Sequence, residues 1–567
     1  MTSSWQERIR RVIADPSHLA IALIIGAVVG STIVAFMAFT DWMHALLFSQ
    51  SMPVWLRPLT PALAALIAGY LLMKVFPDAR GSGVPQTKAS LIAGEGYISL
   101  RTATGKFLCC AISLGGGVAL GREGPSVQIG AGVASFLLRR VGLGKRDVQA
   151  LVPVGVAAAL AAAFNTPVAA VLFTLEELLG DMNAGLLGSV VIGAATSWMV
   201  LHLWLGDTPL FRVPAYSLVH PTEFLFYAIL GVAGGLISVA FTTALLRLRL
   251  QYRRLPGWTL PFQPATGGLT AGLLALYSAE VLGAGYAAVE LALHGQLTTT
   301  QMFVLLVLKF VATVFCYSSG NAGGIFGPSL FLGAMLGGSF GSALHTWFPA
   351  TTAPAGAYAL VGMATTFAGV IRSPITAVVM IFELTRDYNI IVPLMISSLV
   401  AYGVARALAH TPIYDALASQ DGVHLPHPKG HRQEPDLLVA DAMQHPGLLL
   451  SPETTVAAAR LLVPEGDCLI GHDGRLSSVL PRRALDEALR HGQGDETLGS
   501  IAVSQFPNYL PHLHPDHPAD LVLHRLSRFD LSLLPVVDRR DVTRLLGQVT
   551  VKDLMRAYRN PPGLRTS

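Results

Sequence analysis

The chain has 567 residues, of which 52% are hydrophobic and only 13% are charged, and its mean hydropathy is +0.53. Soluble domains carry about 25% charged residues, so this composition excludes an ordinary soluble protein and predicts a membrane protein with several spans. The net charge of +4 is mild and gives no sign of a nucleic-acid partner.

Apolar runs recur from about residue 17 to about residue 409. The first, LAIALIIGAVVGSTIVAFMAF, follows QERIRRVIADPS, whose three arginines favour a cytoplasmic N-terminus. This run lacks a small-residue cleavage site after a short apolar core, so we expect a retained helix instead of a signal peptide. Composition then becomes polar, which places a membrane domain at 1–415, a linker at 416–437 and a further region at 438–567.

The apolar part contains an internal repeat. GREGPSVQIGAGVAS (121–135) resembles GIFGPSLFLGAMLGG (324–338), and FNTPVAAVLFTLEEL (164–178) resembles IRSPITAVVMIFELT (371–385). The two offsets, 203 and 207 positions, are nearly equal. They predict a duplicated unit with halves at about 15–205 and about 220–410, and transporters often bind their substrate where such halves meet.

The pattern G-x-x-x-P occurs at 81–85, 121–125 and 324–328. Proline fits the first turn of a helix, and glycine permits the tight backbone before it. Each break therefore predicts a helix that begins inside the membrane, with free N–H groups and a partial positive charge at its N-terminus. Several such ends at one point would bind an anion without a full positive charge.

Ionisable residues at membrane depth indicate function. A carboxylate at Glu123 would compete with the anion and withdraw when protonated, which links anion passage to protons; the alternative is an ion pair with Arg122. Glu176 or Glu177, at the end of VAAVLFTLEELLG, is a second proton station or an interfacial helix-end carboxylate. Lys106 is a buried-charge candidate, and its alternative is snorkelling to the interface.

The segments GSGVP, GKFLCCAISLGGGVALGREGP, FNTPVAAVLFTLEE, GGIFGP and TPIYDAL, in this order over about residues 15–420, resemble the CLC chloride channel and transporter family. The resemblance implies an all-α polytopic membrane fold of two inverted halves with broken helices. It also implies a homodimer with one pathway in each subunit. The implied function is transport of chloride, coupled to protons as an antiporter, with a passive chloride channel of the same fold as the alternative. No enzymatic activity and no cofactor are expected.

The resemblance also assigns site residues. Glu123 matches the external gating glutamate and Glu177 the internal proton-transfer glutamate of exchanging members, so their joint presence favours exchange. Ser82 favours chloride over nitrate, and fluoride is a minor alternative. The expected anion-binding groups belong to Ser82, Gly83, Ile325, Phe326 and Tyr414. The expected supporting residues are Arg122, Lys106, Gly121, Gly124 and Pro125.

The last part of the chain has a different character. PVVDRRDVTRLLGQVTVKDLMRAY (535–558) predicts strand, turn, strand and helix, and it resembles a CBS module spanning 500–560. Residues 438–499 resemble a degenerate first copy, which adds a small α/β cytoplasmic domain to the fold. Thr550 and Asp553 fit the spacing with which some CBS modules hold an adenine nucleotide, and a structural or dimer-stabilising role is the alternative.

Other sequence features are less specific. The cluster HLHPDH (512–517) is a metal or pH-sensing candidate, with a solvated loop as the alternative. The four cysteines form no CxxC pair and are expected to be packing residues: Cys109, Cys110, Cys316 and Cys468.

Two functions of other classes compete with transport. An intramembrane hydrolase would use Ser82 as nucleophile but lacks a histidine motif beside it. A nucleotide-binding regulatory protein would have an inert membrane part. The short linkers and the lack of an organelle signal favour a prokaryotic inner membrane, with both termini in the cytoplasm.

Overall fold

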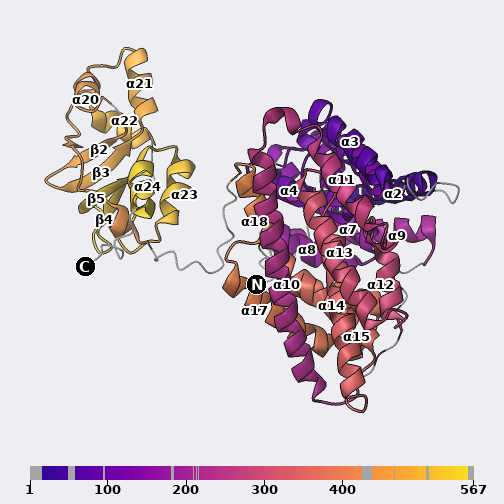
Figure 1. Cartoon of the computed structure of the whole chain (residues 1–567). Helices are drawn as coiled ribbons and strands as arrows, with labels where there is room; N and C mark the ends of the chain where they lie inside the picture. The colour runs from indigo at the N-terminus through magenta and orange to yellow at the C-terminus, as the bar shows by residue number, and fades with distance from the viewer. Residues whose placement is uncertain are drawn as a thin grey trace. The chain divides into compact units, whose positions relative to one another are not determined.

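The computed structural model of the full chain describes residues 16–48, 56, 58–93, 96–180, 184–207, 210–211, 213–214, 216, 218–423, 437–464, 466–505 and 510–559. Contacts divide the chain into two compact units, Met1–Pro428 and Lys429–Ser567. In Figure 1 the first unit runs from indigo to orange and consists of helices, whereas the second is orange to yellow and contains strands.

Helices of the first half of the membrane unit follow one another with short connections. They are α2 (Pro16–Leu47), α3 (Leu59–Lys74), η2 (Pro77–Ala79), α4 (Val84–Ala93), α5 (Leu100–Gly115), α6 (Glu123–Arg140), α7 (Lys145–Phe164), α8 (Pro167–Phe173), η3 (Thr174–Leu179) and α9 (Ala184–Leu205).

The second half repeats this arrangement of long and short helices. Its elements are α10 (Glu223–Arg254), η4 (Gly257–Thr259), α11 (Gln263–Leu274), η5 (Ala279–Val281), α12 (Tyr286–Leu293), α13 (Thr299–Ser318), α14 (Phe326–Trp347), α15 (Ala355–Ile371), α16 (Pro374–Thr385), η6 (Tyr388–Ile390), α17 (Ile391–Leu408) and α18 (Ile413–Gln420). Among the described residues, six helices are long and apolar enough to cross a membrane.

Glycine pairs bring the central helices of each half into backbone contact. A Cβ added at Gly130 of α6 would lie 2.4 Å from the carbonyl oxygen of Gly155 of α7. A Cβ added at Gly333 of α14 would lie 2.1 Å from the carbonyl oxygen of Gly362 of α15. These pairs have the same offsets as the sequence repeats, 203 and 207 positions. Small residues thus allow the same close helix packing in both halves.

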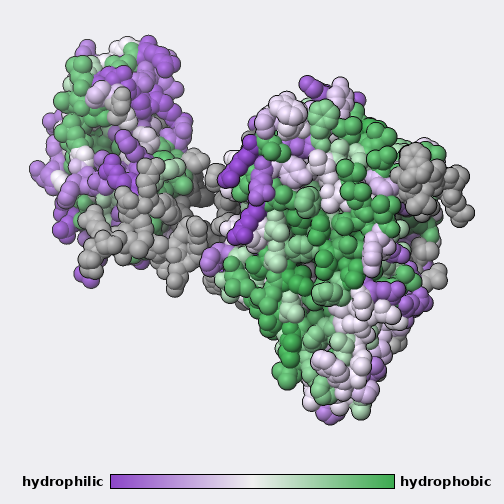
Figure 2. Space-filling view, in the orientation of Figure 1, coloured by the Kyte–Doolittle hydropathy of each residue, from purple (hydrophilic) through white to green (hydrophobic). Residues whose placement is uncertain are grey.

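The outer surface of the membrane unit is apolar. On α10 the side chains of Leu225 and Leu236 are 65% and 51% exposed, and on α17 that of Leu399 is 63% exposed. Figure 2 shows this hydrophobic face of the unit, with hydrophilic residues gathered towards its ends. Such an apolar surface suits the hydrocarbon core of a membrane.

The second unit contains two small sheets. In the first, β1 (Leu449–Leu450) pairs parallel with β2 (Cys468–His472), which pairs antiparallel with β3 (Arg475–Leu480). In the second, β4 (Leu533–Val537) pairs antiparallel with β5 (Leu545–Thr550). Its helices are α19 (Val439–Ala442), α20 (Val456–Leu462), α21 (Arg482–Arg490), α22 (Leu498–Gln505), α23 (Asp520–Phe529) and α24 (Val551–Arg559).

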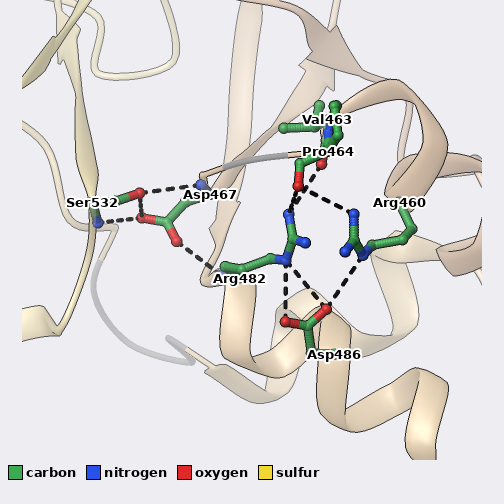
Figure 3. A network of polar contacts seen from close by, with 7 residues as sticks. All are labelled: Arg460, Val463, Pro464, Asp467, Arg482, Asp486 and Ser532. Carbon is green, nitrogen blue, oxygen red and sulfur yellow. Dashed lines mark hydrogen bonds and ion pairs between the residues drawn. The ribbon is translucent and has the colours of Figure 1, made fainter.

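Strand, turn, strand and helix, predicted for 535–558, agree with β4, β5 and α24. One buried carboxylate joins the two sheets. Asp467, just before β2, accepts hydrogen bonds from the Ser532 amide at 2.5 Å and the Ser532 hydroxyl at 2.9 Å, and from the Arg482 amide at 2.8 Å (Figure 3). Ser532 immediately precedes β4, so this carboxylate ties the two sheets together.

Candidate functional site

The two repeat-related breaks pair with each other through the backbone. Gly121 donates to the Gly324 carbonyl at 2.7 Å, and Gly324 donates to the Gly121 carbonyl at 2.8 Å. The helices α6 and α14 begin two residues later, at Glu123 and Phe326. Two helix N-termini, one from each half of the duplication, therefore lie side by side in the protein interior.

The third break packs against them. Gly83 has φ +108°, and a Cβ there would lie 2.3 Å from the Gly124 carbonyl oxygen. Conversely, a Cβ at Gly124 would lie 2.7 Å from the Ser82 carbonyl oxygen. Only glycine tolerates this left-handed backbone and this approach. Because α4 begins at Val84, a third helix N-terminus joins the other two.

Glu123 is fully buried, at 0% exposure, at the start of α6. One carboxylate oxygen accepts a hydrogen bond from the Tyr286 hydroxyl, and the other accepts from the Gly327 amide of α14 at 3.2 Å. The carboxylate thus occupies the positive end of a helix from the other half of the repeat. The alternative of an ion pair with Arg122 is wrong: no salt bridge joins these two described residues, and the guanidinium lies 5.7 Å from the centre of the Tyr286 ring.

The predicted anion-binding residues surround the same place. Ser82 Oγ is buried and makes no hydrogen bond of standard geometry to the described residues, although the Tyr317 hydroxyl faces it. Ile325 and Phe326 stand at the start of α14, where backbone N–H groups have no partner within the helix. Tyr414 on α18 is 1% exposed, and α18 packs on α4, which begins directly after Ser82 and Gly83.

The remaining supporting residues fix the backbone of the breaks. Lys106 of α5 is fully buried and donates to the Gly81 carbonyl at 2.7 Å, so the alternative of snorkelling to the interface is wrong. Pro125 lies in the first turn of α6, where its missing N–H costs nothing. A Cβ at Gly121 would lie 2.3 Å from a carboxylate oxygen of Glu123, which explains glycine at this position.

The two glutamates of the LEEL segment have different partners. They lie in the π-helical turn η3, a kind of turn that is frequent at functional sites. Glu177 is 6% exposed, and its Oε1 lies 3.1 Å from Lys88 Nζ, which also lies 3.0 Å from Asp415 Oδ1. Glu176 instead accepts from the Thr376 amide at 2.8 Å, at the N-terminus of α16. Of these two glutamates, Glu177 therefore faces the buried charged groups of Lys88 and Asp415, whereas Glu176 faces a helix N-terminus.

Three residues of this region are absent from the sequence-based prediction: Tyr286, Lys88 and Asp415. Lys88 lies in the polar stretch VPQTKAS, where a lysine gives no signal of a buried site. Asp415 directly follows Tyr414, and the pattern TPIYDAL predicts a role only for the tyrosine. Tyr286 begins α12, far from Glu123 in sequence, and no local pattern connects the two residues.

Comparisons with known proteins identify the family of this chain. Residues 64–406 match the family described as Voltage gated chloride channel. The chain belongs to this family, which is also called CLC. It is 33% identical over 432 residues to the H(+)/Cl(-) exchange transporter ClcA of Salmonella arizonae, covering 73% of this chain and 91% of the relative. Residues 503–560 match the CBS domain.

Solved CLC structures have the same fold. A slow cyanobacterial Cl-/H+ antiporter superposes with a TM-score of 0.67 at 25% identity, over 72% of this chain and 98% of the other. A eukaryotic CLC transporter superposes with a TM-score of 0.68 at 22% identity, over 94% of this chain and 97% of the other. The predicted fold, a CLC membrane protein followed by a small α/β CBS region, is therefore confirmed.

The residues of the CBS region that are predicted to bind ligands have partners within the chain. Asp553 Oδ2 accepts from the Thr550 hydroxyl at 2.6 Å and from the Thr550 amide at 3.1 Å, so the two residues cap α24 in this CLC protein. Among the described residues no three His, Cys, Asp or Glu side chains are grouped as metal ligands. Burial lowers the pKa of His512 and His517 from the usual 6.5, which favours the neutral form of both side chains.

The cysteines and the hydrolase alternative are simply resolved. The four cysteines, predicted to be packing residues, are all buried and free: Cys109, Cys110, Cys316 and Cys468. Ser82 has no histidine hydrogen-bonded to it among the described residues, so the site lacks the base that a serine nucleophile needs.

Proposed function

We propose that this CLC protein exchanges chloride for protons, with Glu123 as the external gate and Glu177 as the internal proton-transfer residue. The observation that carries the proposal is the position of the Glu123 carboxylate, bound to the Gly327 amide at the N-terminus of α14. A negative group already occupies the place that the helix ends offer to an anion. Chloride and this carboxylate would compete for it.

Protonation would resolve that competition. A neutral carboxyl group gains little from the helix N-terminus and accepts hydrogen bonds less strongly than the anion does. It would leave the site, and chloride would take its place beside the Ile325 and Phe326 amides and the hydroxyls of Ser82 and Tyr414. Entry of chloride and uptake of a proton by Glu123 are thereby linked.

Glu177 would pass protons between the opposite water phase and Glu123. It is 6% exposed and lies in the turn that directly follows α8. Tyr414 directly precedes Asp415, whose Oδ1 lies 3.0 Å from the same Lys88 Nζ that pairs with Glu177, so the predicted proton and chloride routes would converge near this residue. The relatives named as Cl-/H+ exchangers favour coupling over a passive channel of the same fold.

Flux measurements in reconstituted vesicles test this proposal. An outward chloride gradient should drive protons into vesicles that contain the parent protein. Glu123→Gln and Glu177→Gln should each pass chloride without moving protons. Glu176→Gln is the matched control, because it changes the adjacent carboxylate, which caps α16, and should leave coupling intact. Chloride flux without proton movement by the parent would instead identify a passive channel.

The assembly and surroundings follow from the same family. We propose a homodimer in the prokaryotic inner membrane, with both termini and the CBS region in the cytoplasm. Val168 and Ile375, at the starts of the repeat-related helices α8 and α16, are 54% and 50% exposed and would suit a subunit contact. Thr550 and Asp553 remain the candidates for an adenine nucleotide, which would have to open their mutual cap.

A further inference from the structure

A buried ion triad surrounds the predicted internal glutamate. Lys88 Nζ lies 3.1 Å from Glu177 Oε1 and 3.0 Å from Asp415 Oδ1. Lys88, Glu177 and Asp415 are 5%, 6% and 8% exposed. They come from three separate elements, and α4 packs on both of the others, η3 and α18. The Lys88 ammonium group donates one hydrogen bond to Glu177 and one to Asp415.

The elements of the triad also carry the anion site. The helix α4 begins directly after Ser82 and Gly83. Asp415 follows Tyr414 in the first turn of α18. A change in charge at Glu177 therefore changes the electrostatic interactions of Lys88 and Asp415. These two residues belong to α4 and α18, the helices that position the predicted chloride-binding hydroxyls of Ser82 and Tyr414.

Among the described residues, charged groups face Glu177 from three elements. Lys88 approaches from α4 and Asp415 from α18, and Glu176 lies beside Glu177 in η3. Glu176 is engaged by the amides of α16. With Glu177 ionised the triad has a net charge of −1, and with Glu177 protonated it is neutral.

We propose that Lys88 and Asp415 are positioning residues that set the proton affinity of Glu177, with Asp415 cancelling the charge of Lys88 so that Glu177 can both bind and release a proton. Without Asp415, the ammonium group would hold Glu177 ionised. Without Lys88, two facing carboxylates would hold a proton between them. This inference rests on the proposed exchange function and adds a determinant of its pH dependence.

Single and double substitutions give opposite predictions. Asp415→Asn leaves a neutral Lys88–Glu177 pair, so proton transport should fall to half at a pH about one to three units lower than in the parent. Lys88→Met should move the same midpoint upwards by a similar amount. In the double variant Lys88→Met/Asp415→Asn the charges of the parent are restored, −1 and 0, and the midpoint should return towards the parental value.

The measurement is chloride-driven proton flux in vesicles, as a function of pH on the side that Glu177 faces, over about pH 4 to pH 9. Chloride flux measured in parallel shows that each variant is folded and conducting. Lys88→Arg keeps the charge and should retain the parental midpoint, which covers the case in which Lys88→Met does not fold. An infrared difference spectrum, with Glu177→Gln as reference, should report the same midpoints from the carboxylic acid band.

The outcomes separate this inference from the proposed function. No proton transport by the parent would refute the exchange function itself. Proton transport by the parent with unshifted midpoints in both single variants would overturn the role of the triad, and lower activity at an unchanged midpoint would assign it a purely structural role. Opposite shifts, reversed in the double variant, would establish it.

Discussion

The Glu123 carboxylate is held by two donors of different kinds. The Gly327 amide belongs to the backbone of α14 and is available to any anion, whereas the Tyr286 hydroxyl belongs to α12. The Tyr286 ring packs edge-on against Phe211, with ring centres 5.3 Å apart, and under Arg122. Tyr286 therefore adds a hydrogen bond that stabilises the ionised carboxylate inside the site.

Loss of the Tyr286 hydroxyl should release the proposed gate, Glu123, more easily. A hydrogen bond to a charged group contributes about 1.5–3 kcal/mol, so Tyr286→Phe should raise chloride turnover by roughly tenfold and move its pH midpoint to higher pH. Isotopic chloride flux at several pH values measures both effects. Phe211→Leu, which keeps the hydroxyl and changes only the ring contact, is the control. An unchanged turnover in Tyr286→Phe would show that this bond does not hold the gate.

Site residues that belong to a local sequence pattern could be predicted from the sequence. Ser82 and Glu123 stand within glycine-proline breaks, and their positions follow from the physics of a helix N-terminus. Lys88 contacts Glu177 and Tyr286 contacts Glu123, in each case from a segment distant in sequence. Their identification needs the packing of α4 on η3 and the hydrogen bond from Tyr286 to Glu123, which no local pattern specifies.

Two helices of opposite halves cap each other. Glu176, at the end of the first half's repeat segment, accepts from the Thr376 amide of α16 at 2.8 Å. Glu383, its repeat mate, accepts from the Val168 and Ala169 amides of α8 at 2.9 and 2.7 Å. Glu176 of η3 thus caps the helix that carries Glu383, and Glu383 caps the helix α8 that leads into η3.

Removal of either cap should cost stability without abolishing exchange. Glu176→Ala and Glu383→Ala each remove the side-chain acceptor from a helix N-terminus, and the loss of such a cap costs about 0.5–2 kcal/mol. We expect similar falls in the thermal unfolding midpoint of the detergent-solubilised protein, and a smaller fall for Glu176→Gln, which keeps an acceptor oxygen. A fall for only one of the two alanine variants would contradict the symmetry of the caps.

At the level of elements, the breaks, the duplication and the strands near the C-terminus follow from sequence because each is marked by glycine, proline or alternating apolar residues. The π-helical turn η3 is not marked in this way. The segment TLEELL reads as the end of an ordinary helix, and only the packing of its two glutamates in different directions distinguishes it.

The membrane unit as a whole is built around the contact of its two halves. The Gly121–Gly324 bridge, the reciprocal glutamate caps and the paired glycines of α6 with α7 and α14 with α15 all obey the same duplication. The sequence predicts this duplication from two matched motifs. Residue boundaries of the membrane, linker and CBS parts stay predictions, since contacts divide the chain once, after residue 428.

Competition between chloride and the Glu123 carboxylate for the N-terminus of α14 is the claim on which the account depends. Its most direct test is crystallographic: anomalous diffraction from bromide-soaked crystals of the parent and of Glu123→Gln. We expect a bromide next to the Gly327 amide in the variant and none at that position in the parent. Bromide beside Gly327 in both proteins, with the parental carboxylate still in place, or in neither protein, would contradict the account.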